Sequence, residues 1–519
     1  MLNRWYFIVR CVLSMKRVFS SPWVNCIVAL LAGLGLRLLF ILKFPATSGD
    51  TVLYEQMATN WLQHHVYAMN VDGAITPVDM RMPGYPAFLV LIYLLTGKIG
   101  AAAHFFVMLA QALVDLAGCV VIAALGVALL VTVDGTARVW PVFRAGLWLA
   151  ALCPFIANYC ATLLTETLAV LFTTIALLFV SLLLGNSYEL VFPKALRPWD
   201  WGPDYRLPAI CAGLIIGVGT LLRPETPLLL MAAWMGTAAV LWPHRKFRAW
   251  LRIVIFSGLA CVLPLLPWAV RNAITLHEVQ FLAPKNSNLP SELVPKGFMA
   301  WEKTWLFRVR DAYQVSWKLN GEAIEIETIP ARAFDTAEEK TRVAEILEQY
   351  NDDLTITPQE DAAFGQLARE RTARHPLRTY AYLPTARAFT LWFTPRIELL
   401  PVSGTVFPLK QNWYDDRADQ LTTVGFFFLN IFYVILGICG AWRLWHWNRA
   451  VRPVVLTLAI FALLRTVFIT TLETPEPRYV LECYPIVLAC GATLFGKPYE
   501  KAAARAALQC SWFSSGQRN

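Results

Sequence analysis

Charged residues are scarce in this chain. Asp, Glu, Lys and Arg together make up 16% of the 519 residues, whereas hydrophobic residues make up 57%. A soluble protein needs more polar surface than this composition provides, whereas a protein with many membrane spans does not. The 20 Trp and 17 Tyr agree with this interpretation, because amphipathic rings gather at membrane–water interfaces. We therefore expect an all-α polytopic membrane protein.

The motifs of several other protein classes are missing. No Cys-x-x-Cys occurs, and none of the 11 cysteines lies in the hydrophilic segment 271–420, so we expect neither disulfides nor a cysteine-bound metal. The net charge of +9 is spread over short segments between apolar runs, which indicates membrane topology rather than a nucleic acid partner. No nucleotide-binding glycine pattern occurs in a segment expected in the cytosol. No cofactor is indicated, and a divalent metal is an open alternative only because carboxylates lie near His64-His65, for which a solvated pair is the simpler interpretation.

Ten apolar runs are long enough, or nearly long enough, to cross a bilayer. They are residues 22–42, 103–131, 141–160, 162–184, 207–222, 226–243, 252–270, 421–442, 453–472 and 479–496. Clusters of Lys and Arg lie between the runs, and such clusters tend to stay in the cytosol. They are Arg4, Arg10, Lys16 and Arg17; Arg138 and Arg144; Lys194, Arg197 and Arg206; Arg245, Lys246, Arg248 and Arg252; Arg443, Arg449 and Arg452; and Lys497, Lys501 and Arg505. All of them face the cytosol if both termini do, as expected for a multi-pass protein of the cytoplasmic (inner) membrane.

The apolar run at residues 83–97 must not cross if this orientation is right. Its apolar residues are about half to two-thirds of what a membrane-spanning helix needs. A crossing here would place every later cluster of positive charge outside. We therefore predict a re-entrant or interfacial helix on the outer side, with Pro83 and Pro86 in its first turn, where a missing N–H costs little.

The spans and loops divide the chain into three parts. These are a transmembrane module at 1–270 with its first outer loop at 43–102, an outward-facing α-rich cap at 271–420, and the last spans with a cytosolic tail at 421–519. The basic N-terminus shows no cleavage pattern, so we expect the first apolar run to be an uncleaved span. Translation starting at Met15 is an alternative to translation starting at Met1.

The first outer loop contains the sequence GDTVLYEQMATNWLQHH. Leu53, Met57 and Trp61 recur every four residues, which is typical of an amphipathic helix lying on the membrane surface. Asp50 stands at the start of this helix, directly after the first span. Its carboxylate can cap the helix, act as a catalytic base, or do both.

Two helices can be predicted in the cap. Thr336-x-x-Glu339 and Thr357-Pro358-x-Glu360 have the spacing of capping boxes, and the second has Pro at the first helical position. We expect the two helices to extend to about Tyr350 and Arg374.

Further ionisable residues gather at the outward ends of the spans. They are Glu166, Arg223, Glu225, Arg271, Glu473, Glu476 and Arg478, with Arg37 and Arg465 inside the outer third of their spans. Ionisable groups at such depths are costly and usually mark a site. For Arg37 the alternative is a side chain that extends to the interface. Asp115 lies deeper, and the only role we assign to it is that of a buried partner.

A series of short motifs extends over most of the chain. They are Asp50 with Tyr54; R-x-P-G-Y-P from Arg81 to Pro86; L-T-E from Leu164 to Glu166; G-x-x-x-G before L-x-R-P (Gly213, Gly217, Leu221, Arg223, Pro224); P-W-x-x-R-N from Pro267 to Asn272; His375-Pro376; and Arg478-Tyr479 with Pro485. In this order they resemble the GT-C membrane glycosyltransferases, specifically the branch of bacterial aminoarabinose transferases and protein O-mannosyltransferases. Many relatives carry an acidic–basic pair directly before the proline motif, where this chain has Asp79-Met80-Arg81-Met82. Protein O-mannosyltransferases have Asp-Glu after the first span, where this chain has Asp50-Thr51, so a protein acceptor is less expected.

The resemblance implies a fold, a reaction and a set of site residues. The fold would be a GT-C-like bundle of about ten transmembrane helices with interfacial helices and a small outward-facing cap. The reaction would move a sugar from a polyprenyl-phosphate donor to an envelope glycan, lipid or protein, with inversion. A phosphate leaving group needs no general acid, only positive charge near its oxygens. Asp50 is expected as the base and Glu166 as a second acidic group, while Tyr54, Arg81, Tyr85, Arg223, Arg271, Arg478 and Tyr479 are expected to bind substrate.

Other functions are compatible with the same composition. A secondary transporter would usually show paired halves and polar residues at mid-membrane, whereas here the polar groups lie at one end of the spans and no repeat is visible. A non-catalytic scaffold would not need Asp50. A lipid-linked oligosaccharide ligase or polymerase is poorly separated by sequence, and the sugar and the acceptor stay open.

Overall fold

The computed structural model describes residues 22–131, 139–192, 204–284, 286, 292–447 and 449–496. Both candidate start positions, the N-terminal basic cluster, the tail from Lys497 onward, and Arg138, Lys194 and Arg197 lie outside these residues. Within them the chain is mostly helical, and the strands form one antiparallel hairpin.

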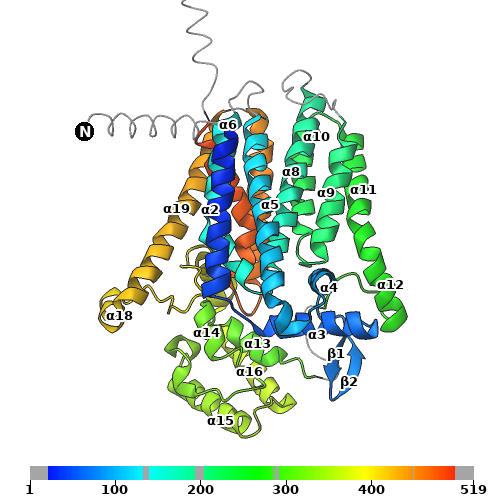
Figure 1. The fold of residues 1–519 in the computed structure, drawn as a ribbon. Helices are drawn as coiled ribbons and strands as arrows, with labels where there is room; N and C mark the ends of the chain where they lie inside the picture. The colour runs from blue at the N-terminus through cyan, green and yellow to red at the C-terminus, as the bar shows by residue number, and fades with distance from the viewer. Residues whose placement is uncertain are drawn as a thin grey trace, which may run out of the picture.

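The helices form a bundle with a cap at one end, here called the cap end (Figure 1). The bundle holds α2 (Pro22–Lys43), α5 (His104–Val131), α6 (Val139–Ala151), α7 (Pro154–Ala157), α8 (Glu166–Val191), α9 (Arg206–Thr220), α10 (Leu228–Leu241), α11 (Phe247–Val262), α12 (Leu266–Thr275), α19 (Arg417–Trp447), α20 (Arg452–Thr470) and α21 (Tyr484–Thr493). The layer at the cap end holds α3 (Gly49–His64), β1 (Ala68–Val71), β2 (Ala74–Pro77) and α4 (Gly84–Thr96). The cap holds α13 (Lys296–Lys303), α14 (Val309–Gln314), α15 (Ala337–Asp353) and α16 (Pro358–Arg374). The chain then returns to the bundle through α17 (Leu383–Trp392) and α18 (Leu409–Asp415). Shorter turns are η1 (Gly100–Ala103), η2 (Asn158–Ala161), η3 (Leu263–Leu265), η4 (Ile326–Thr328), η5 (Ala331–Ala333), η6 (Arg378–Tyr382), η7 (Arg449–Val451) and η8 (Pro477–Cys483).

Each of the ten predicted spans contains helix, but the helices differ in length. By length and composition, six helical stretches of the described residues can cross a membrane, and they contain α2, α5, α8, α11 with α12, α19 and α20. A seventh is α6 with the α7–η2 turn, which together bend by 48°. The remaining three are shorter, since α9 has 15 residues, α10 has 14 and α21 has 10. The protein is therefore an all-α polytopic membrane protein in which some predicted spans are short helices of the bundle.

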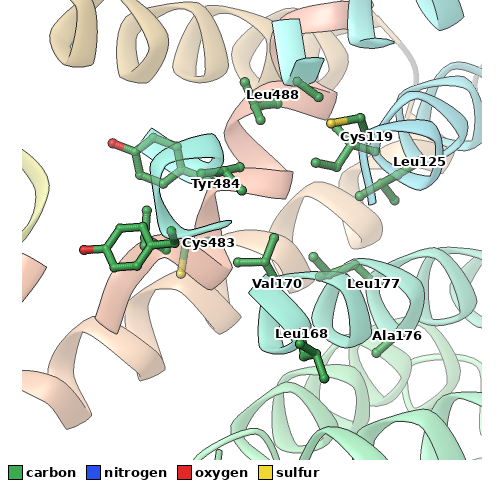
Figure 2. Packing of buried hydrophobic residues seen from close by; sticks show 14 of the residues in the cluster. Cys119, Leu125, Leu168, Val170, Ala176, Leu177, Cys483, Tyr484 and Leu488 are labelled. Atoms are coloured by element: carbon green, nitrogen blue, oxygen red, sulfur yellow. The ribbon is translucent and has the colours of Figure 1, made fainter. Parts of the chain in front are cut away.

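One large apolar core extends through the bundle. In Figure 2, Val170 of α8 lies near Cys483 at the end of η8, next to Tyr484 of α21. The short helix α21 is thus surrounded by other helices, and its core-facing residues are almost completely buried.

Small residues allow α9 and α11 to pack closely. A Cβ added at Gly213 would lie 2.2 Å from the carbonyl oxygen of Ser257, and one added at Gly217 would lie 2.3 Å from that of Cys261. The G-x-x-x-G motif noted in the sequence therefore serves helix packing in this structure.

Arg37 does not extend to the interface. Its Nε lies 2.7 Å from Oδ2 of Asp115, and its Nη1 donates to the carbonyl oxygens of Gly33 and Ala151. Both charged side chains are almost fully buried, so the pair connects α2 with α5 and α6. Asp115 is thus confirmed as a buried partner, and the alternative of an interfacial Arg37 was wrong. A buried pair needs these additional hydrogen bonds because desolvation of both charges is costly.

The predicted short helix is α4, which has 13 residues. It begins against the turn after α9, where the amide of Gly84 donates to the carbonyl oxygen of Leu221 at 2.7 Å. A Cβ at Gly84 would lie 2.5 Å from the same oxygen, so only glycine fits. Tyr85 and Leu89 are buried against the bundle, and the opposite face of α4 is exposed. The helix ends at Gly97, which takes a left-handed conformation.

The cap has its own apolar core and the two predicted helices. Thr336 accepts a hydrogen bond from the amide of Glu339 at the start of α15, and Thr357 forms a complete capping box at the start of α16. Both helix starts are confirmed, and the ends fall at Asp353 and Arg374. The core of the cap includes two fully buried tryptophans, Trp301 and Trp305.

Candidate active site

The helix α3 lies across the cap end of the bundle (Figure 1) and places Asp50 in its first turn. Ser48 is the N-cap, since its side chain accepts from the amide of Thr51, whose hydroxyl in turn accepts from the amide of Ser48. The interpretation of Asp50 as the cap was therefore wrong. Because Ser48 and Thr51 satisfy the helix terminus, the Asp50 carboxylate is available for other partners.

The apolar stripe of α3 is covered by protein. Met57 is fully buried among residues of the β-hairpin and α12, including Tyr67 and Trp268, with Leu53 and Trp61 packed against the same cluster. The stripe thus fixes α3 to its neighbours, in contrast to the expected contact with the membrane surface.

Two arginines hold the Asp50 carboxylate. Nη2 of Arg81 lies 2.8 Å from Oδ1, and Nη2 of Arg478 lies 3.0 Å from Oδ2. Burial by itself raises the pKa of Asp50, but the two guanidinium groups outweigh it and lower the pKa to about 2. The carboxylate is therefore ionised at neutral pH, with its two oxygens bound to different segments of the chain.

The charges continue from Arg478 to the head of α8. Nη1 of Arg478 lies 3.5 Å from Glu166, and its Nε lies 2.7 Å from Glu476. Glu166 is the first residue of α8 and is bound more closely by Arg223, at 2.5 Å. The second carboxylate oxygen of Glu166 is buried and has no hydrogen-bond partner in the described part of the chain. The structure thus brings Asp50, Glu166 and Arg478 together, as the sequence analysis expected, although they lie far apart in the sequence.

The same network extends into the bundle. Glu225 lies 3.9 Å from Arg223 and 3.1 Å from Arg465, and Arg465 also binds Glu482 at 2.6 Å. Positive and negative groups alternate along this path, so each charge has an opposite neighbour. Glu482 was not predicted as a site residue, because a single Glu in an apolar run gives no signal of its partner.

Tyr479 lies between two of these arginines. The guanidinium carbons of Arg223 and Arg478 lie 5.1 and 5.3 Å from its ring centroid, and its hydroxyl donates to Glu476 at 2.6 Å. Its ring thus holds both arginines in place through cation–π contacts.

Tyr54 and Tyr85 lie beside each other, with ring centroids 5.0 Å apart. Tyr85 is fully buried, and its hydroxyl donates to Gln111 of α5 at 2.7 Å. In this structure Tyr85 attaches α4 to the bundle, while Tyr54 packs against it from α3.

Arg271 lies apart from the carboxylates. It donates to the carbonyl oxygens of Val78 and Tyr67 at 2.8 and 2.6 Å, and it lies over the rings of Tyr67 and Trp268. Arg81, Arg223 and Arg478 form ion pairs with Asp50 or Glu166, whereas Arg271 contacts neither carboxylate in this structure.

Two cavities are lined by segments close in sequence to Asp50 or to its arginines. The first, here called the polar cleft, has a volume of about 620 Å³; its lining includes Ser48, Gly49, Tyr313, Trp317, Glu398, Glu476 and Arg478. The second, here called the apolar groove, has a volume of about 430 Å³; its lining includes Pro83, Gly84, Ala87, Leu221, Pro267, Trp268 and Arg271. Arg478 of the polar cleft and Arg81, which lies just before the groove residue Pro83, bind the two oxygens of Asp50. Asp50 lines neither cavity, but its two arginines connect it to the wall of the polar cleft and to the segment that leads into the apolar groove.

The sequence did not single out the cap residues of the polar cleft. Tyr313, Trp317 and Glu398 belong to segments with no motif, and their place follows from how the cap contacts the bundle. Among the described residues, no group of three or more His, Cys, Asp or Glu side chains is arranged to hold a metal ion.

Comparisons with known proteins give two structural similarities. No protein-family model matches the sequence, and no curated protein matches it. The archaeal oligosaccharyltransferase AglB from Archaeoglobus fulgidus, solved with an inhibitory peptide and a dolichol-phosphate, matches with 12% identity and a TM-score of 0.46 over 95% of this chain and 52% of that chain. ArnT from Cupriavidus metallidurans, solved in the apo state, matches with 13% identity and a TM-score of 0.35 over 91% of this chain and 77% of that chain. The chain thus spans about half the length of the oligosaccharyltransferase, and similarities of this size carry no conclusion about substrate or mechanism.

Proposed function

We propose that this protein transfers a sugar from a polyprenyl-phosphate donor to an acceptor at the cap end of the membrane. The observation that carries the proposal is the Asp50 carboxylate, which is held by two arginines: Arg478 lines the polar cleft, and Arg81 belongs to the segment that leads into the apolar groove. Such a site can accept a lipid tail from one side and a polar acceptor from the other. The proposal places both termini in the cytosol and the cap outside the cytoplasmic membrane.

The apolar groove is the proposed site of the donor lipid. Its walls come from α4, the turn at Leu221 and the Pro-rich start of α12, and the exposed face of α4 carries Leu91, Leu94 and Leu95. Arg271 lies in this groove, and Arg81 lies beside it. A guanidinium group binds phosphate through two parallel hydrogen bonds, which suits these residues to the phosphate of the donor.

Donor binding would activate Asp50. With a pKa of about 2, the carboxylate is a weak base while Arg81 and Arg478 are bound to it. A donor phosphate competes for the same arginines, and each guanidinium that turns to the phosphate removes a positive charge from beside Asp50. The pKa of Asp50 then rises, and the carboxylate becomes able to accept a proton.

The transfer would be a single displacement. Asp50 takes the proton from the acceptor hydroxyl, and the oxygen attacks the anomeric carbon of the donor sugar. The bond from that carbon to the phosphate oxygen breaks, and its electron pair leaves with the polyprenyl phosphate, stabilised by the arginines. Attack from the opposite face inverts the anomeric configuration. The unpartnered oxygen of Glu166 can accept a hydrogen bond from a sugar hydroxyl and so orient the ring.

The proposal is tested by transfer from a radiolabelled polyprenyl-phosphate sugar in membranes that contain the wild type or Asp50→Asn. We expect transfer by the wild type and a loss of at least about a thousandfold in the variant, since the base is removed. Asp72→Asn, an exposed residue of the same outer loop, is the matched control and should transfer normally. Normal transfer by Asp50→Asn would exclude Asp50 as the base, and absence of transfer by the wild type with several donors and acceptors would favour the transporter or scaffold.

A further inference from the structure

The cap contributes an exposed aromatic pair to the polar cleft. The ring centroids of Tyr313 and Trp317 lie 4.1 Å apart at an interplanar angle of 75°. The exposed fractions of the two residues are 42% and 46%. The same cap buries Trp301 and Trp305 completely. The cap has an apolar core that can bury tryptophans, so the small size of this domain does not explain why the pair is exposed.

A carboxylate without a partner lies in the same cleft. Glu398 forms no ion pair and no side-chain hydrogen bond with another residue in the part of the chain that the structure describes. Burial raises its pKa, against the effect of the nearby Arg396. A partly buried carboxylate with no protein partner is free to accept hydrogen bonds from the hydroxyl groups of a ligand in the cleft.

We propose that the polar cleft binds a sugar ring of the acceptor, which stacks on Tyr313 and Trp317 and donates hydroxyl hydrogen bonds to Glu398. This inference rests on the function proposed above and narrows the acceptor to a glycan or glycolipid. The volume of about 620 Å³ lies within the range of about 300–1,000 Å³ that is usual for small-molecule sites.

The chemistry of the cleft fits an uncharged, hydroxyl-rich ring. The apolar C–H face of a pyranose carries partial positive charge and is attracted by the negative face of an aromatic ring. The cationic residues of the cleft are Lys43 and Arg478, and the acidic ones are Glu398 and Glu476, so the lining favours neither an anionic nor a cationic ligand. A bare lipid alcohol has a single hydroxyl, which is the reacting group at Asp50, so it has no second hydroxyl to donate to Glu398.

The cleft also leads the ring to the reacting groups. Ser48 and Gly49 line it directly before Asp50, and Arg478 of its wall binds the Asp50 carboxylate. A ring held on the cap side of this cavity can therefore present a hydroxyl to Asp50 while the donor occupies the apolar groove.

Binding of simple glycosides tests the inference without requiring catalysis. Methyl glycosides of glucose, galactose, mannose and N-acetylglucosamine are added to the purified full-length protein in detergent, and ligand-observed NMR reports binding. We expect at least one glycoside to bind the wild type, and to bind Trp317→Ala at least about tenfold more weakly, since stacking is lost. Trp317→Phe keeps an aromatic face and should restore most of the affinity. Trp413→Ala, an exposed tryptophan outside the cleft, is the matched control and should bind as the wild type does.

The outcomes separate the two proposals. If no glycoside binds the wild type, or if Trp317→Ala binds as the wild type does, the sugar site is wrong. If binding shows the expected pattern but no donor sugar is ever transferred, the sugar site stands and the transferase function fails. In a transfer assay with a glycan acceptor, Trp317→Ala should raise the KM for the acceptor at least about tenfold and leave the KM for the donor unchanged, because the variant affects acceptor binding alone.

Discussion

At the scale of residues, the candidate site depends on which arginine meets which carboxylate. Arg478 contacts Asp50, Glu166 and Glu476, more carboxylates than Arg81 or Arg223 contacts. Its planar fork bridges these groups, and the ring of Tyr479 supports it. A point charge on a flexible stem cannot form the same set of contacts, so charge alone does not define this position.

Arg478→Lys tests this geometry. We expect transfer to fall about a hundredfold, because lysine retains the charge but cannot bind Asp50 and a phosphate oxygen in the same way. Arg417→Lys, at an exposed position at the start of α19, is the matched control. Transfer rates in membranes, normalised to the amount of folded protein, give the comparison. Equal rates for Arg478→Lys and the wild type would show that only the charge matters.

At the scale of elements, close contacts between backbones position the site. The helix α4 begins against the carbonyl of Leu221, two residues before Arg223, so it links the apolar groove to the network around Glu166. The side chain of Arg81 reaches Asp50 from the segment directly before α4. The position of α4 thus fixes two of the arginines relative to the two carboxylates.

Gly84→Ala should disturb this arrangement. The added Cβ would lie 2.5 Å from the Leu221 oxygen, so α4 must shift away. We expect a loss of stability of roughly 1–3 kcal/mol, typical of overpacking, and transfer lower by at least about tenfold. Gly35→Ala in α2 is the control, since nothing lies within 4 Å of its Cβ position. Thermal unfolding in detergent and transfer assays measure both effects, and a fully active Gly84→Ala would show that this contact does not position the site.

At the scale of the whole molecule, polar contacts help to join the cap to the bundle. Arg387 of α17 donates to the carbonyl oxygens of Lys303, Leu306 and Thr470, and Lys303 forms an ion pair with Glu473 at 2.7 Å. Glu302 is buried at this junction and is bound by the hydroxyl of Ser316. Burial raises the pKa of Glu302 to about 8, so the folded protein holds this proton at neutral pH.

Stability should therefore fall as the pH rises. Below the ordinary pKa of Glu near 4.5, Glu302 is protonated in both states, whereas between this value and about 8 only the folded state holds the proton. Over this range the wild type should lose roughly 2–4 kcal/mol relative to Glu302→Gln, which cannot ionise. Thermal unfolding of the full chain in detergent at pH 5 and pH 8.5 measures the difference. Glu322→Gln, at an exposed position of the cap, should show the pH dependence of the wild type, and an identical pH dependence for Glu302→Gln would contradict the prediction.

The sequence by itself determined the class of the protein, most of its helices and the residues that gather at one end. Hydropathy, capping boxes and short motifs are local signals, so the α-rich membrane bundle, the cap helices that follow Thr336 and Thr357, and the short helix at 83–97 could be predicted from them. Hydropathy placed α9 and α10 to within two residues at each end, whereas the run predicted at 479–496 is divided between η8 and the short helix α21.

Only the tertiary structure decided how these residues act together. Ser48 rather than Asp50 caps α3, which leaves the carboxylate for Arg81 and Arg478. The Asp50–Arg478 contact joins residues 428 positions apart. The aromatic pair Tyr313 and Trp317 of the cap lines the same polar cleft as Arg478. Such contacts depend on the packing of distant segments, so no local pattern in the sequence specifies them.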